Sequence, residues 1–262
     1  MIIKTQDIPK LKHSARILAS MMYHLKGMVK SGVSCGDLND FAQEFITSHG
    51  AKPSFKGLYG YPYTLITEID DEVVHGMSPK TKIIPDNCVI SLDCGAIWEG
   101  MFSDMCILLT VGKVSADVEK LVQKTEESLW AGIRQVKAGK TVGDIGFAID
   151  KVLKDAGLGN VLDLGGHGIG YKPHSDPHIT HAGRAGKGSK LFENQCICIE
   201  PMVTLGSGKV KFVNEKNSDG SYEVVKSIEG VPAAHIEHQL LITKKGCEVI
   251  TAIEKDQVLP IL

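Results

Sequence analysis

Several features that mark particular protein classes are missing from this sequence. Lysine and arginine are scattered and the formal net charge is -2, whereas nucleic acids and anionic membranes bind concentrated positive charge. No apolar window is long enough to span a bilayer, and the N-terminal residues contain no secretory hydrophobic stretch. We therefore expect a cytoplasmic protein with no specific nucleic-acid partner and no membrane partner.

Disulfide and phosphate-binding motifs are missing as well. The seven cysteines form an odd set without a Cys-x-x-Cys pair, which favours reduced, buried thiols over a disulfide framework or a thiolate zinc site. The glycine-rich segment 165–170 does not match Gly-x-Gly-x-x-Gly. Pro173 and Pro177 also prevent the helix whose N-terminus would hold a phosphate, so nucleotide binding is not predicted.

What is present is an ordinary globular chain of 262 residues, 43% hydrophobic and 23% charged, with no linker. We expect one domain spanning residues 1–262. Hydrophobic periodicity predicts helices over residues 7–30, 35–49, 116–136 and 142–156. The predicted strands cover residues 63–69, 88–109 as a hairpin, 160–164, 194–205, 210–226 as a second hairpin, and 234–243.

Two helices followed by strands occur twice along the chain, which indicates a pseudo-symmetric α+β domain with its site between the halves. Two segments are predicted to be loops: residues 53–62, with aromatic side chains as an exposed recognition surface, and residues 165–188. Asp7 is predicted to start the first helix. Thr141, with Asp144 three residues later, is predicted to cap the fourth.

Two carboxylates stand on the two arms of the first hairpin. Asp93 and Asp104 lie among residues that ought to be buried, where an ionised carboxylate is costly unless a cation or a donor compensates it. For a single aspartate in a strand, a structural role, such as capping a turn or facing solvent, is the better interpretation. Because two occur on facing arms, we expect positive charge between them.

Further ligands are expected from His167 in the glycine-rich segment and from Glu200 and Glu237, which lie in apolar strands. Four carboxylates and one imidazole suit a pair of hard or borderline divalent cations better than one tetrahedral zinc ion. The glycines around His167 permit a close approach of the backbone.

Proton transfer is expected from histidines outside this ligand set. A histidine in a loop is usually a solvated side chain, so no single one stands out. We expect His75 and His174 in this role, with His178 as the nearest competitor.

Several motifs stand in the order and spacing of one known family. They are Tyr59-Gly60-Tyr61-Pro62, Val73-Val74-His75-Gly76, Asp93 with Asp104, Gly166-His167-Gly168-Ile169-Gly170, His174 with Pro177, Ile199-Glu200-Pro201-Met202, and Ile236-Glu237-His238. On these residues the chain resembles the bacterial type I methionine aminopeptidases over nearly its whole length. The resemblance implies an α+β pita-bread fold, whose pseudo-two-fold halves, each with two helices and antiparallel strands, surround a central metal site.

The same resemblance implies a site and an activity. The implied ligands of two divalent cations (Co, Mn, Fe, Zn or Ni) are Asp93, Asp104, His167, Glu200 and Glu237. Asp104 and Glu237 would bridge both ions, Glu200 would be the general base for a shared water, and His75 and His174 would contact the scissile peptide. The family removes the N-terminal methionine of peptides and nascent proteins whose second residue is small. A monomer that contacts the ribosome transiently is expected.

The sequence departs from the family pattern around the methionine pocket, which Tyr61, Ile66 and Tyr222 are predicted to line. Ile66 stands where the family has cysteine, and Tyr222 is the aromatic residue nearest to an expected tryptophan. The other departures are Asp70, Met105, Tyr171 and Ser175. The changes bear on side-chain preference and leave the metal ligands intact.

Two other functions remain open. A related pita-bread aminopeptidase of the X-Pro type would share the ligands, but such relatives usually carry an additional N-terminal domain, for which 262 residues leave no room. A non-catalytic pita-bread protein that binds protein or RNA partners is disfavoured because all five ligands are retained.

Overall fold

The computed structural model describes all 262 residues, and its four α-helices lie where helical periodicity predicts them. They are α1 (Ile8–Lys26), α2 (Cys35–Ser48), α3 (Ala116–Ile133) and α4 (Val142–Ala156). Thr141 and Asp144 form the predicted capping box of α4. Asp7 precedes α1 without capping it, because its carboxylate accepts a hydrogen bond from the Tyr171 hydroxyl at 2.7 Å instead. None of the helices combines the length and apolarity needed to cross a membrane.

The strands pair antiparallel in four sheets. Their bounds are β1 (Lys52–Pro53), β2 (Leu65–Ile69), β3 (Glu72–Val74), β4 (Cys88–Trp98), β5 (Met101–Val111), β6 (Gly159–Asn160), β7 (Gly166–Gly168), β8 (Ser175–Ile179), β9 (Cys196–Ile199), β10 (Met202–Thr204), β11 (Val210–Asn217), β12 (Gly220–Ser227), β13 (Ala233–His235), β14 (His238–Ile242) and β15 (Cys247–Val249). Both predicted hairpins, β4–β5 and β11–β12, are confirmed.

Two of the predicted strands are broken. The segment 194–205 divides into β9 and β10 at Glu200 and Pro201, and the segment 234–243 divides into β13 and β14 at Ile236 and Glu237. Pro201 has no N–H to continue a ladder, which favours a break at that position. Because the pairing is antiparallel, β9 then pairs with β14, and β10 pairs with β13.

The two predicted loops are more ordered than expected. Residues 165–188 contain β7 and β8, because glycines allow β7 to lie close to its neighbours. In the segment 53–62, Phe55 and Tyr61 are buried, and Tyr59 alone among its aromatic residues is exposed, at 76%. The prediction that the aromatic residues of this segment form an exposed surface is wrong, because Phe55 and Tyr61 pack with Ile66 in one buried cluster.

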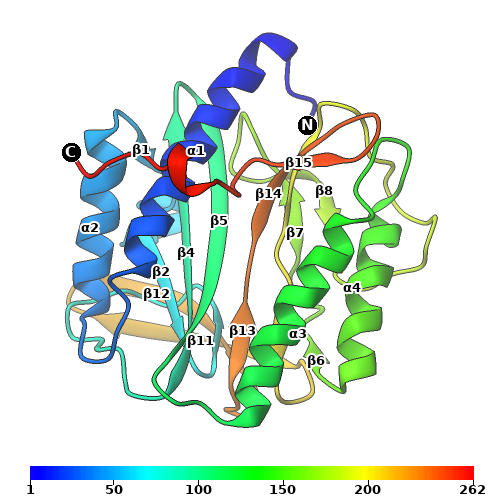
Figure 1. Cartoon of the computed structure of the whole chain (residues 1–262). Coiled ribbons are helices and arrows are strands. Elements are labelled where there is room, and N and C mark those ends of the chain that lie inside the picture. Colours follow the sequence, from blue (N-terminus) through cyan, green and yellow to red (C-terminus); the bar gives the residue numbers. More distant parts are fainter.

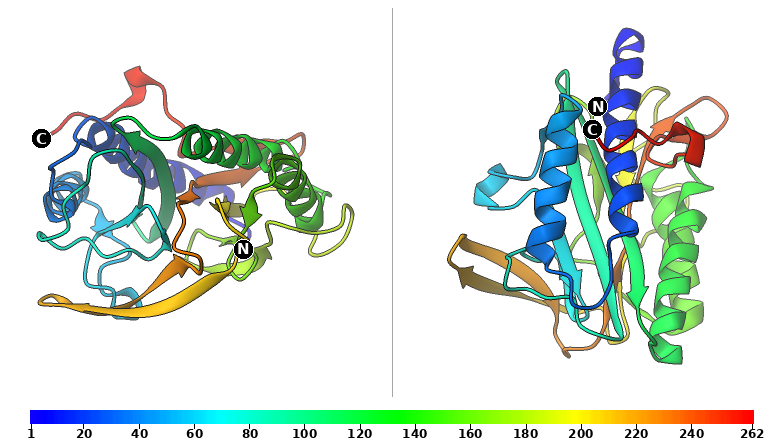
Figure 2. Two further views of the ribbon diagram at one scale, coloured as in Figure 1. Left: turned by 90° about the horizontal axis from the view of Figure 1, so that it is seen from below. Right: turned by 60° about the vertical axis from the view of Figure 1, so that its left-hand side comes forward.

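The two halves repeat one arrangement, as predicted (Figure 1). α1 and α2 pack on the sheet that contains β2, β4 and β5, whereas α3 and α4 pack on the sheet β15-β14-β9-β7-β8. Burial of the apolar side chains between helices and sheet stabilises each half. The view from below in Figure 2 shows the helices along one side of the molecule and the β11–β12 ribbon along the opposite side.

The β4–β5 hairpin places its carboxylates on one face. Asp93 lies opposite Cys106, and Gly95 lies opposite Asp104. Directly opposite residues share a face, and faces alternate along a strand, so Asp93, Asp104 and Cys106 project in the same direction.

Strand β2 adds two residues to this inner face. Ile66 lies opposite Asp93, and Glu68 lies opposite Ser91, so both project with Asp93. Cys94 and Met105 project from the other face into the core beneath α1 and α2.

Helix α2 holds the start of β2 through Asn39. The side-chain oxygen of Asn39 accepts hydrogen bonds from the buried N–H groups of Thr64 and Leu65, at 2.8 and 3.2 Å. Asn39→Ala leaves both donors without an acceptor, and an unsatisfied buried group costs about 1–3 kcal/mol. We predict that its free energy of unfolding, measured by urea titration, falls by about 2 kcal/mol or more. Thr47→Ala, on the exposed end of the same helix, is the control and should change it by less than ~0.5 kcal/mol; equal losses in the two variants would contradict the role of Asn39.

Candidate active site

One cavity of about 340 Å³ is lined by residues of both halves. It receives every site residue predicted from the sequence: Tyr61, Ile66, His75, Asp93, Asp104, His167, His174, Glu200, Tyr222 and Glu237. His178, the competing histidine, is exposed on β8 and lies outside the lining.

The strand breaks aim Glu200 and Glu237 into the cavity. Pairing of β9 with β14 and of β10 with β13 sets the two breaks side by side. Glu237 is also bound to β5 by two backbone hydrogen bonds: its N–H donates to the Cys106 carbonyl at 3.0 Å, and its carbonyl accepts from the Cys106 N–H at 3.4 Å. This tie brings Glu237 next to Asp104, two residues along β5.

The glycines of β7 allow the close approach that the sequence predicts. A Cβ atom on Gly166 would lie 2.2 Å from the carbonyl oxygen of Cys198, and one on Gly168 would lie 2.3 Å from that of Asp176. Both distances are far inside van der Waals contact, so only glycine fits on either side of His167.

Hydrogen bonding fixes the tautomer of His167. Its Nδ1 lies 3.1 Å from the carbonyl oxygen of Gly168, which can only accept, so Nδ1 carries the proton. Nε2 is then a free lone pair, and it lies 3.5 Å from Glu200 Oε1 and 3.9 Å from Asp104 Oδ2. Burial lowers the pKa of His167 to about 3, so the imidazole is neutral at neutral pH. A backbone carbonyl behind one nitrogen and a free second nitrogen are typical of a metal-binding histidine.

The carboxylates in this cavity repel one another. Burial, followed by the charges of the neighbouring carboxylates, raises the pKa of Asp104, Glu200 and Glu237 well above the usual range. Burial raises the pKa of Asp93 to about 7. One oxygen each of Asp93, Asp104 and Glu237 is buried without a hydrogen-bond partner. Such a set of unpartnered anionic oxygens fits hard or borderline divalent cations.

The ligand atoms fall into overlapping groups. Those of Asp93, Asp104 and Glu237 lie within 4.8 Å of one another. Asp104 and Glu237 each belong also to a second such group that contains His167. The arrangement can therefore accommodate two neighbouring ions with these two carboxylates between them.

His75 and His174 offer neutral imidazoles to the cavity. Burial lowers the pKa of His75 to about 4, and burial also lowers the pKa of His174. The His174 ring lies edge-on to His167, with centroids 4.5 Å apart, and the His75 ring lies 5.9 Å from that of Tyr222. His75 has a φ of 64°, an uncommon conformation for a residue with a Cβ atom.

The other end of the cavity is apolar. The Tyr61 hydroxyl donates to the Gly76 carbonyl at 2.7 Å, which leaves its ring edge-on to Tyr222 with centroids 4.9 Å apart. The lining residues that sequence reasoning missed include Phe55, Leu58, Val74, Leu164 and Met202. Sequence position alone could have pointed to Val74 and Met202 as lining residues, because each lies within two residues of a predicted site residue.

Comparison with known proteins gives a consistent result. Residues 9–244 match the family described as metallopeptidase family M24. The methionine aminopeptidase of Clostridium perfringens is 37% identical over 255 residues, which cover 97% of this chain and 100% of that protein. The crystal structure of methionine aminopeptidase from Rickettsia prowazekii is 30% identical with a TM-score of 0.89, over 96% of this chain and 99% of that one. The Xaa-Pro dipeptidase from Bacillus anthracis shares the fold, with a TM-score of 0.75 at 22% identity, over 97% of this chain and 62% of that one.

Without cations, the buried carboxylates should make stability fall as the pH rises. A carboxyl group whose pKa is raised by folding holds its proton more tightly in the folded state, so its contribution is present at low pH and is lost as the pH rises through the folded-state pKa, about 7 for Asp93. The buried histidines, whose pKa values are lowered, oppose this trend below pH 6.5, so the parent is compared with Asp104→Asn, which keeps all of them. We predict that in a chelator the free energy of unfolding of the parent, measured in urea, falls relative to that of Asp104→Asn by about 2 kcal/mol or more between pH 5 and 7. Added Mn(II) or Co(II) should remove this fall.

Two variants test whether the response to cations comes from the cavity carboxylates or from charge at the protein surface. Asp104→Asn should no longer respond to the cations, whereas Asp117→Asn, at an exposed position of α3, should respond as the parent does. A chelated parent whose stability changes with pH over this range as that of Asp104→Asn does would show that the carboxylates do not repel one another as described.

Proposed function

This chain belongs to metallopeptidase family M24, and from that premise we propose that it removes the N-terminal methionine from peptides and nascent proteins. It is a metallo-aminopeptidase whose full-length relatives are methionine aminopeptidases. The observation that carries the proposal is a single cavity with four carboxylates and a neutral imidazole at one end and aromatic side chains at the other. The charged end suits metal-assisted peptide hydrolysis, and the apolar end suits an unbranched, flexible side chain such as methionine.

We propose that two divalent cations bind in this cavity. Their ligands are Asp93, Asp104, His167, Glu200 and Glu237, with Asp104 and Glu237 shared between the ions. The overlapping ligand groups and the unpartnered oxygens support this number. Oxygen-rich sets with one imidazole accept Co, Mn, Fe, Zn or Ni. When bound, the cations polarise the peptide carbonyl and make water more acidic.

Glu200 is the proposed general base. Its carboxylate lies in the strand break at the centre of the cavity, with Oε1 facing His167 and Oε2 facing His235 Nε2 at 3.7 Å. Burial and its anionic neighbours raise its pKa, which makes it a stronger base than an exposed glutamate. It takes a proton from the attacking water and passes it to the leaving amine.

His75 and His174 bind the scissile peptide. Both are neutral at neutral pH and each can donate one hydrogen bond, which suits the peptide oxygen or the nitrogen of the departing amine. Tyr61, Ile66 and Tyr222 hold the methionine side chain. Cytoplasmic action, transient contact with the ribosome and a monomeric state stay predictions.

Replacing Glu200 by glutamine removes the base and keeps its size. We predict that Glu200→Gln lowers kcat on a Met-Ala peptide by about 10²–10⁴-fold, because that is the usual contribution of general-base catalysis. The assay should follow hydrolysis with Co(II), Mn(II) and Fe(II), and circular dichroism should confirm the fold. Glu193→Gln, at an exposed position, is the matched control. A parent protein inactive with every metal would instead favour the non-catalytic alternative.

Substrate preference separates this proposal from an X-Pro activity. The apolar end of the cavity should make kcat/KM for Met-Ala peptides exceed that for Ala-Pro peptides by about 10-fold or more, since loss of an apolar side chain costs ~1–3 kcal/mol in such a pocket. Tyr222→Ala should narrow the difference, because it removes one aromatic wall. Faster cleavage of Ala-Pro would refute the methionine preference and leave the metallopeptidase chemistry intact.

A further inference from the structure

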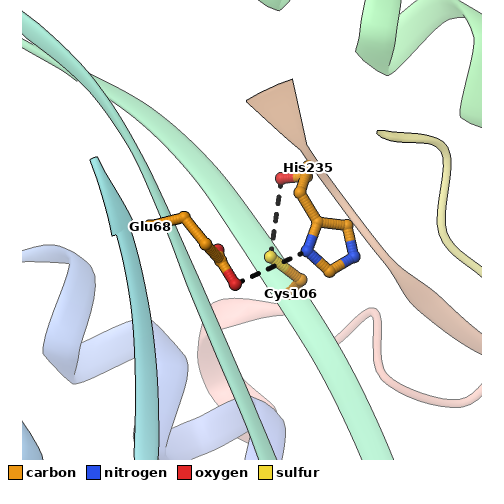
Figure 3. Close-up of side chains that lie close together, drawn as sticks. All are labelled: Glu68, Cys106 and His235. Atoms are coloured by element: carbon orange, nitrogen blue, oxygen red, sulfur yellow. Dashed lines mark hydrogen bonds and ion pairs between the residues drawn. The ribbon is translucent and has the colours of Figure 1, made fainter. Parts of the chain in front are cut away.

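A second group of ligand-type side chains lies outside the cavity lining (Figure 3). Glu68 comes from β2, Cys106 from β5 and His235 from the end of β13, and their ligand atoms lie within 4.8 Å of one another. All three are buried, with exposures of 2%, 1% and 1%. The first two share the inner face of the β2–β4–β5 sheet, and the His235 N–H is bound to that sheet by the Ser91 hydroxyl at 3.1 Å.

The carboxylate oxygens and ring nitrogens of this group lack hydrogen-bond partners. Neither carboxylate oxygen of Glu68 and neither ring nitrogen of His235 makes a hydrogen bond. Glu68 Oε1 and His235 Nδ1 are 3.9 Å apart, too far for a hydrogen bond. Two nitrogen or oxygen ligands of a tetrahedral zinc ion lie ~3.3 Å apart, so these two atoms need to move only a few tenths of an ångström closer to share one cation. The Cys106 thiol also contacts His235: it donates a hydrogen bond to the backbone carbonyl oxygen of His235 at 3.4 Å.

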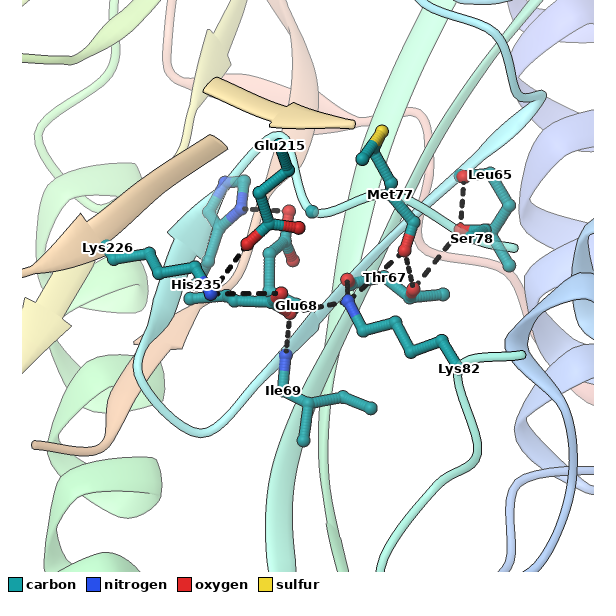
Figure 4. A network of polar contacts seen from close by, with 12 residues as sticks. Leu65, Thr67, Glu68, Ile69, Met77, Ser78, Lys82, Glu215, Lys226 and His235 are labelled. Atoms are coloured by element: carbon teal, nitrogen blue, oxygen red, sulfur yellow. Dashed lines mark hydrogen bonds and ion pairs between the residues drawn. The ribbon is translucent and has the colours of Figure 1, made fainter. Parts of the chain in front are cut away.

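No cationic side chain pairs with Glu68. The neighbouring lysines pair with other carboxylates: Lys226 pairs with Glu215 at 2.7 Å, as Figure 4 shows. Lys82 pairs with Glu72, and Lys226 lies 3.9 Å from Glu72 as well. Burial, and then the charge of Glu72, raises the pKa of Glu68 well above its usual range. An anionic Glu68 therefore needs a counter-charge that the surrounding side chains do not supply.

We propose that Glu68, Cys106 and His235 bind one zinc ion in a structural site separate from the two-ion cavity. They supply the carboxylate, thiolate and imidazole ligands that zinc binds in proteins, and the second oxygen of Glu68 provides a fourth donor. Thiolate and carboxylate together balance the charge of a divalent ion. Residue spacing does not predict this thiolate zinc site, because the three residues are far apart along the chain and only strand register brings them together.

The site has a consequence for the cavity. Zinc on Nδ1 leaves the proton of His235 on Nε2, the nitrogen that lies 3.7 Å from Glu200 Oε2. The ion would thus fix the tautomer and the direction of an imidazole that faces the proposed general base.

Metal content tests the site directly. The purified protein is treated with a mild chelator that empties the accessible cavity, and retained zinc is measured by plasma mass spectrometry. We expect about one zinc ion per chain in the parent and in Asp93→Asn, because a buried structural zinc exchanges slowly, and less than ~0.1 in Cys106→Ser and Glu68→Gln. Equal zinc in the parent and in Cys106→Ser would overturn the proposal.

Cobalt substitution is a second test, in which the spectrum of the parent protein alone reveals whether a sulfur ligand is present. Co(II)-loaded parent protein should show a sulfur-to-cobalt charge-transfer band in the near ultraviolet, which the oxygen and nitrogen ligands proposed for the cavity cannot produce. Cys106→Ser should lose the band, and Cys198→Ser, which removes the thiol nearest His167 and Glu237, should keep it. A parent without the band, or a band lost only in Cys198→Ser, refutes the site. Neither readout uses hydrolysis, so the result does not depend on the proposed function.

Discussion

Repulsion among four buried carboxylates is the constraint to which the rest of this structure conforms. Asp93 and Asp104 come from one half of the molecule, whereas Glu200 and Glu237 come from the other. Holding them together without cations opposes folding, as their raised pKa values indicate. The opposing free energy comes from two apolar cores, one beneath each helix pair, in which each fully buried large side chain contributes about 1.5–3 kcal/mol. Cation binding would then reduce the repulsion among the carboxylates that the packing of the two cores holds together.

The same geometry divides the cavity by chemistry. Carboxylates and histidines gather where β5, β7 and the two strand breaks meet, and the aromatic cluster around Tyr61 closes the other end. In the binding mode proposed above, a peptide whose apolar first side chain lies against Tyr61 and Tyr222 has its first peptide bond near Glu200. Selectivity and hydrolysis therefore depend on different elements of the fold, which allows residues such as Ile66 to differ from the family pattern while the ligands stay the same.

Sequence reasoning succeeded where a feature is encoded locally. The helices follow from the spacing of their apolar residues, and the cap of α4 follows from Thr141 and Asp144. It failed where partners far along the chain decide the outcome. Pro201 was a local signal for the break beside Glu200 that the prediction did not use. An apolar run reads the same whether it continues or breaks, so the break at Glu237 could not be seen. The burial of Phe55 likewise depends on rings that only the folded chain brings together. The predicted site residues share a cavity, yet Glu68 carries no motif and was missed.

The register of strands β2, β4 and β5 explains where the ligands lie and why the sequence alone does not show it. Leu92, Cys94 and Met105 lie in the core beneath α1 and α2, so their apolar contacts fix which face of the sheet points outward to the helices. A slip of one residue would turn the carboxylates into that core and the apolar side chains into the cavity. By selecting the register, the core places Asp93 and Asp104 toward the cavity and sets Glu68 and Cys106 on the same face. Residues that never touch a ligand thus determine where each ligand lies.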